Sequence, residues 1–197
     1  RINFIEQLIL VVLVYCLISL FIALPFYLSN YQVTFLNSLF EAVSGITGTG
    51  FSVFNNIKYL DPTLVLWRSS SQWIGGLYFL FFLILIFSNK QFNFKMNDLT
   101  YSEDGSINSE NNIKDLLTKI FILYSLLSFI IFLLLNFSEV RMFNSLNLSM
   151  SLVSSGGSIP TNSLNKIIQT NSQKIILIFS LLISMLNFFL VFNLFKK

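Results

Sequence analysis

The chain has 197 residues, of which 54% are hydrophobic and only 11% are charged, with a formal net charge of +3. An ordinary soluble domain has about 25% charged residues, and a soluble fold of this length could not bury so much apolar surface. The small, dispersed charge argues against nucleic-acid binding. The absence of histidine from the sequence removes the commonest general base and zinc ligand. We therefore expect an integral protein of the lipid bilayer, neither an enzyme nor a cofactor-binding protein.

Four apolar stretches are long enough to form membrane-spanning helices, since the hydrocarbon core requires about 20 predominantly apolar residues. They lie at residues 5–28, 64–88, 117–137 and 175–195. The first lacks the small-residue cleavage site of a secretory signal, so we interpret it as a permanent helix.

Residues 89–113 separate the second span from the third and are polar, with many Asn and Ser residues. Such a composition is typical of a loop in water. Lys and Arg are more frequent beside this loop and at the two chain ends than in the other connections, which favours the cytoplasmic side for it.

The other two connections, residues 29–63 and 138–174, each contain a short semi-apolar segment followed by a cluster of Gly, Ser and Thr. An offset of 107 residues, which places Gly50 on Gly157, aligns the two halves of the chain. Internal duplication of this kind is typical of pseudo-symmetric membrane folds. Each half has an even number of full spans, so the two halves share one orientation.

These patterns predict an all-α membrane protein built of two tandem parallel repeats, residues 1–88 and 114–197. Each repeat is a helix, a re-entrant pore hairpin and a second helix, which gives four transmembrane helices and two hairpins. Irregular backbone is tolerated at membrane depth only where protein buries it or where it lines a water-filled cavity. A pore is therefore the expected setting for both hairpins.

The two clusters are the candidate ion-binding selectivity filter. They are Thr47, Gly48, Thr49 and Gly50 in the first half, and Ser154, Ser155, Gly156 and Gly157 in the second. A potassium filter replaces the hydration shell of the ion with rings of backbone carbonyls, in conformations that glycine permits. Thr and Ser hydroxyls can coordinate an ion or hold the loop, and the negative end of the preceding short helix would point toward the cation. The alternative is that each cluster is an ordinary turn.

The run from Phe40 to Ser52, with the segments 66–69 (Leu-Trp-Arg-Ser) and 72–76 (Gln-Trp-Ile-Gly-Gly), resembles the second pore unit of the Trk/Ktr/HKT superfamily of potassium transporters. Residues 153–158 (Val-Ser-Ser-Gly-Gly-Ser), with residues 159–162 (Ile-Pro-Thr-Asn), are similar to the third unit. The resemblance implies four helix, pore-loop, helix units around one pathway, each with one filter glycine. By position these glycines are Gly50 and Gly157.

The resemblance covers two of the four units and also implies the partners and location of the protein. The remaining units would belong to a longer protein, or a second copy of the chain would complete the ring; we favour the longer protein because the halves resemble two different units. Potassium is the expected transported ion and sodium the alternative. The family further implies a plasma membrane, here the bacterial inner membrane, and a homodimer with a cytosolic nucleotide-binding regulatory subunit.

Two residues depart from the family pattern. Gly48 stands where the family usually has Thr, and Ser158 where it usually has Phe. These departures motivate a second interpretation, in which the chain is a non-conducting membrane accessory subunit or a degenerate remnant of such a transporter.

Arg68 and Gln72 lie one helical turn apart near the start of the second span. A charge inside a membrane is costly and marks a functional candidate, unless it snorkels to the headgroups. We expect Arg68 to support the pore structurally, by holding loop carbonyls or an acidic partner such as Glu41, in preference to direct contact with the ion. Trp67, Trp73 and Tyr59 are interpreted as anchors at the membrane interface.

Overall fold

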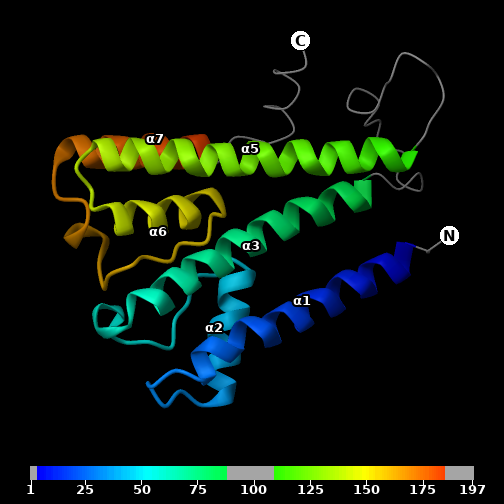
Figure 1. The fold of residues 1–197 in the computed structure, drawn as a ribbon, viewed down its shortest axis with the longest axis horizontal. Coiled ribbons are helices and arrows are strands. Elements are labelled where there is room, and N and C mark those ends of the chain that lie inside the picture. Colours follow the sequence, from blue (N-terminus) through cyan, green and yellow to red (C-terminus); the bar gives the residue numbers. More distant parts are fainter. Residues whose placement is uncertain (1–3, 88–108, 185–197) are drawn as a thin grey trace, which may run out of the picture.

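The computed structural model describes residues 4–87 and 109–184 (Figure 1). The first half contains α1 (Phe4–Tyr27), the short α2 (Phe35–Ile46) and α3 (Pro62–Phe87), and the second half contains α5 (Ser109–Phe137), the short α6 (Met142–Val153) and α7 (Asn171–Ser184). Single 3-10 turns, Ile57–Tyr59 and Leu164–Lys166, lie before α3 and α7. No strand occurs in the described ranges, which confirms the all-helical class.

Two of the described helices are long and apolar enough to cross a membrane, Ile5–Tyr27 of α1 and Lys114–Phe137 of α5. The helix α3 has a similar length, but Arg68, three consecutive serines and Gln72 lower the hydropathy of its first half. The helix α7 is described as far as Ser184, and the rest of the predicted fourth span lies outside the described residues.

The polar connection between the halves is shorter than predicted. Residues 109–113 were expected in the loop and instead form the first turns of α5. Helical hydrogen bonds are satisfied within the backbone itself, so a helix can continue beyond its apolar part into polar surroundings. The remainder of the predicted loop, residues 89–108, lies outside the described residues.

The chain reverses its direction after each short helix, as Figure 1 shows for both halves. In each half a long helix is followed by a turn, a short helix that runs toward the middle of the molecule, and a loop that leads back outward to the start of the next helix. The helix α3 lies between the two short helices and contacts both α2 and α6.

The two halves repeat the same backbone conformation at the same spacing. All residues with positive φ among the described residues fall into three equivalent pairs: Gln32 and Glu139, Gly48 and Ser155, and Gly50 and Gly157. The left-handed region is disfavoured for residues other than glycine, so its recurrence at matching positions is a strong constraint on the chain path. The repeat detected in the sequence is therefore also a repeat of local structure.

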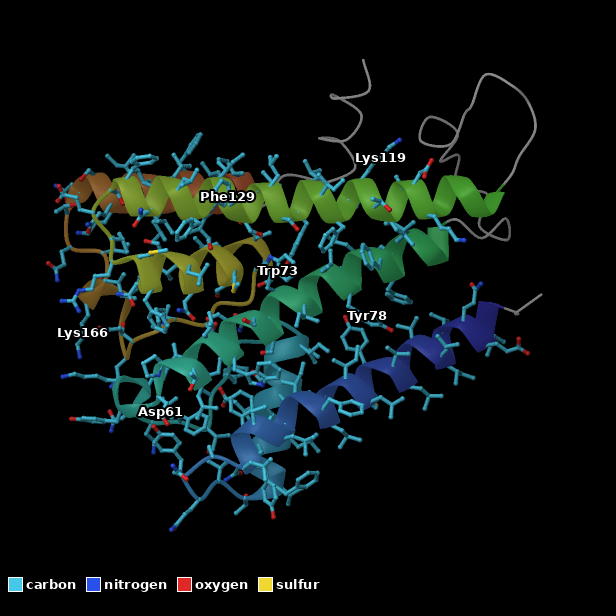
Figure 2. All side chains as sticks on the ribbon, in the orientation of Figure 1. Asp61, Trp73, Tyr78, Lys119, Phe129 and Lys166 are labelled. Carbon is cyan, nitrogen blue, oxygen red and sulfur yellow. The ribbon has the colours of Figure 1, made fainter. Side chains whose placement is uncertain are left out.

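Each half has its own apolar core, and aromatic side chains of α3 join them. Trp67 donates a hydrogen bond to the Ile22 carbonyl in α1 (3.0 Å), and Trp73 donates to the Ser128 hydroxyl in α5 (2.8 Å). Figure 2 shows Trp73 on the side of α3 that faces α5 and α6, and Tyr78 on the side that faces α1. The two tryptophans thus connect α3 to α1 and α5 by hydrogen bonds.

Candidate functional site

The loops after α2 and α6 form a matched pair held by the same backbone hydrogen bonds. In the first loop the Thr49 amide donates to the Ser44 carbonyl (3.1 Å), and in the second the Gly156 amide donates to the Ser151 carbonyl (2.9 Å). These bonds close each short helix over its last turn, where carbonyls would otherwise lack partners. Each loop therefore begins with an equivalent turn at the end of its short helix.

The hydroxyl groups of the clusters bind back to their own helices. Thr47 Oγ1 donates to the Val43 carbonyl (2.6 Å), and at the equivalent position Ser154 Oγ donates to the Met150 carbonyl (2.9 Å). The Thr49 hydroxyl lies 3.1 Å from the Thr47 hydroxyl, a pair that the second loop lacks because Gly156 replaces Thr49 there. The Thr47, Thr49 and Ser154 hydroxyls therefore help to fix the loop conformation.

The two loops lie against each other, and their glycines differ in surroundings. A Cβ atom on Gly50 would lie 2.5 Å from the Gly156 carbonyl oxygen, so only glycine allows this contact. A Cβ atom on Gly157 would have no atom within 4 Å. Gly157 and Thr49 are exposed, whereas Gly156 is buried. One side of the paired loops is thus open and the other is packed.

An ion pair behind the first loop joins α2 to α3. Arg68 Nε and Glu41 Oε1 are 2.5 Å apart, and both side chains are almost fully buried. The Glu41 carboxylate also accepts hydrogen bonds from the Val53 amide (2.9 Å) and the Ser52 hydroxyl (3.1 Å). The structure therefore brings Arg68 together with the acidic partner considered for it, and through that partner it holds the loop that follows Gly50.

Gln72 connects the first half to the second loop. Its side-chain amide donates to the Gly156 carbonyl (2.7 Å), and its Oε1 atom accepts from the Ser158 amide (3.2 Å). Gln72 is buried, so these bonds are formed away from competing water. A residue of α3 thus fixes the backbone on both sides of Gly157.

Small residues let α3 approach both short helices closely. A Cβ atom on Gly75 would overlap the Ile46 backbone at the end of α2, and one on Gly76 would lie 3.1 Å from the Ser154 Cα at the end of α6. The ends of both short helices therefore pack against two adjacent glycines of α3. The sequence motif Trp-Ile-Gly-Gly is explained by this double contact.

Two supports of the loops were not found by sequence reasoning. The Asn162 side chain accepts a hydrogen bond from the Lys58 amide (3.1 Å) and donates to the Asn56 side chain (2.8 Å), which joins the two returning loops. The Ser52 and Val53 contacts with Glu41 were also missed. Neither support has a periodic signal in the sequence, because each depends on how two irregular segments meet.

A cavity of about 440 Å³ lies beside the second loop. Its walls are leucines of α6 and α7, with Ser155 and Gly157 at the loop side. The open side of Gly157 thus faces space bordered largely by apolar side chains in the described part of the chain.

Comparison with known proteins assigns the chain to a family. Residues 5–197 match the TrkH family, described as cation transport protein. An uncharacterized cation transporter of Methanocaldococcus jannaschii is 31% identical over 164 residues, which cover 77% of this chain and 33% of that protein. The Trk system potassium uptake protein TrkI of Halomonas elongata is 39% identical over 72 residues, 36% of this chain and 15% of that protein.

The fold is similar to the crystal structure of the potassium transporter TrkH from Vibrio parahaemolyticus, with a TM-score of 0.79 and 21% sequence identity. The similarity covers 96% of this chain and 38% of that one, so the chain spans well under half the length of the proteins it matches. The family match extends over almost the whole chain. The chain therefore belongs to the TrkH family of cation transport proteins and is a membrane protein.

Proposed function

We propose that this chain forms two pore units of a monovalent-cation transporter, with potassium as the transported ion. The selectivity filter consists of residues 47–50 and 154–157. The observation that carries the proposal is the equivalent conformation of the two loops, with left-handed residues at matching positions and the loops in contact.

The backbone conformation suits a carbonyl filter. Left-handed φ values of 68° at Gly48 and 77° at Gly50 alternate with ordinary conformations, and the second loop has 54° at Ser155 and 70° at Gly157. Alternation of this kind lets successive carbonyl oxygens face one side of the chain, where they replace the water around an ion. Gly48, although unusual for the family, supplies a conformation that Ser155 adopts at some steric cost.

The electrostatics also favour a cation. The helices α2 and α6 end at the loops, and each helix C-terminus has a partial charge of about −0.5. The nearest buried positive charge, on Arg68, is paired with Glu41 and does not stand alone beside the loops. The site therefore attracts a cation through backbone dipoles, and no carboxylate of the described residues lines the cavity beside Gly157.

The proposal includes the membrane arrangement and partners. The helices α1, α3, α5 and α7 span the membrane, and α2 and α6 enter it with their loops and return. Since one side of the paired loops is open, a complete ring needs further pore units or a second copy of the chain. A homodimer with a cytosolic nucleotide-binding subunit in the bacterial inner membrane follows from the family resemblance alone.

The test is rubidium or potassium uptake by cells that lack their own potassium uptake and express the protein in the form its gene encodes. Gly157→Arg places a long cationic side chain on the open side of the loop, where no atom lies within 4 Å of the added Cβ. Uptake should be abolished at equal abundance in the membrane. Asn165→Arg is the matched control, since Asn165 is exposed in the same connection and the substitution adds the same charge. Uptake by this variant should be normal.

Uptake by the unaltered protein and by both variants alike would contradict the placement of the filter. No uptake by the unaltered protein would favour the accessory-subunit interpretation, which the unusual residues Gly48 and Ser158 motivate.

A further inference from the structure

Two buried polar atoms behind the loops have no hydrogen-bond partner among the described residues, Arg68 Nη1 and Ser158 Oγ. Both residues are about 5% exposed, so bulk water cannot reach these atoms. A buried donor or hydroxyl without a partner carries a substantial desolvation cost, and native proteins nearly always satisfy such groups. The two atoms belong to different halves of the molecule and lie close to the same pair of loops.

One small cavity is lined by both residues. It is also lined by Ser44, Phe51 and Gln72, which belong to the supports of the loops. The volume is about 10 Å³, close to the roughly 10–15 Å³ that one water molecule needs. The cavity thus combines the correct size with the polar partners that a buried water requires.

We propose that a single ordered water molecule binds here and bridges the Arg68 guanidinium to the Ser158 hydroxyl. The guanidinium donates to the water oxygen, and the water and Ser158 exchange one further hydrogen bond. Glu41 and Arg68 both line the cavity and neutralise each other, so its lining favours neither a cation nor an anion. A neutral molecule that both donates and accepts fits the chemistry.

The water would complete a network across the two halves. Glu41 holds the first loop through Ser52 and Val53, and Arg68 holds Glu41. The water extends this chain of contacts to Ser158 in the second loop, beside the bonds that Gln72 makes there. This inference concerns the support of the loops and does not depend on whether the protein conducts.

The first measurement is a cryo-electron microscopy or crystal structure of the full protein at a resolution that shows ordered water. Density is expected within hydrogen-bond distance, about 2.7–3.2 Å, of both Arg68 Nη1 and Ser158 Oγ. A cavity without density, or one filled by a side chain, would overturn the proposal.

The second measurement compares two serine variants in the purified protein. Ser158→Ala should lower the midpoint of thermal unfolding and remove the water density, because the water and Arg68 each lose a partner. Ser149→Ala is the control: Ser149 is equally buried, but its hydroxyl donates to the Leu146 carbonyl of its own helix (2.8 Å), so its loss should leave the midpoint nearly unchanged. Equal midpoints for the two variants would refute the bridge, whether or not either variant transports ions.

Discussion

Arg68 and Glu41 form a buried ion pair that joins α3 to α2. Both charges have been removed from water, so their desolvation cost is large and must be offset by the ion pair and the surrounding hydrogen bonds. The Ser52 and Val53 donors supply such bonds to the carboxylate. The pair therefore makes the loop after Gly50 depend on the position of α3.

Removing one member of this pair should strongly lower the stability of the fold, although neither side chain is expected to contact the ion. Arg68→Ala or Glu41→Ala leaves a buried charge unpaired, at a cost of about 3–5 kcal/mol. The double variant should lose less than the sum, because neither charge then remains. The midpoint of thermal unfolding in detergent measures this, and strictly additive losses would show that the two side chains do not interact.

Sequence reasoning identified the residues of the loops better than their surroundings. The repeat located both clusters, and the cost of an intramembrane charge suggested a partner for Arg68. The different fates of Phe51 and Ser158 could not be foreseen: they occupy equivalent positions, yet Phe51 is 71% exposed and Ser158 is 5% exposed. The Ser158 amide donates to the Gln72 side chain of α3, and a repeat in sequence contains no information about that neighbour.

At the scale of elements, α3 is the helix on which both short helices rest. Ile46 of α2 packs against Gly75, and Ser154 of α6 packs against Gly76. Glycine in a helix interior costs about 1 kcal/mol relative to alanine, so their presence here needs a compensating gain. Close packing of the ends of α2 and α6 against α3 provides it.

An alanine at either glycine tests this packing. Gly75→Ala should sharply reduce the amount of folded protein, because the added methyl group would overlap the Ile46 backbone, which cannot move without displacing α2. Gly76→Ala should be tolerated better, since its nearest neighbour is the Tyr124 hydroxyl at the end of a side chain (2.7 Å). Size-exclusion chromatography of detergent-solubilised protein would measure both, and a Gly75→Ala protein as abundant as the unaltered one would contradict the contact.

The elements themselves were largely predictable, and their ends were not. Apolar length located α1, α3 and α5 because crossing a bilayer requires about 20 apolar residues. The beginning of α5 was missed because a helix can extend past the apolar layer, where composition no longer reports its presence. The short helices of the two hairpins were predicted as helices without exact ends, and the structure gives their bounds as Phe35–Ile46 and Met142–Val153.

In the whole molecule, Gln72 and Asn162 are two of the polar side chains that join the loop regions of the halves, one buried and one exposed. Gln72 makes its bonds in a buried position, and Asn162 makes its bonds at an exposed one. Buried hydrogen bonds contribute more to stability than exposed ones, because their loss leaves groups that water cannot satisfy. The register of the two loops should therefore depend chiefly on Gln72.

Gln72→Ala should cost about 1–3 kcal/mol, as the Gly156 carbonyl and the Ser158 amide lose their partner. It should also lower the preference for rubidium over sodium in uptake, because the second loop is no longer fixed beside Gly157. Asn162→Ala is the control and should change neither quantity appreciably. A Gln72→Ala protein with unaltered ion preference would show that this link does not position the filter.

The short helices reach only part of the way across the molecule before the chain returns. Under the proposed function, the narrow part of the ion route is then confined to the four residues of each loop, with water on both sides. The electrical potential across the membrane would fall mainly over this short segment, since water-filled space supports little of the voltage. An ion gains about 2.3 kcal/mol per elementary charge for each 100 mV. The re-entrant path would thus concentrate the driving force of a negative cell interior on the two glycine-containing loops.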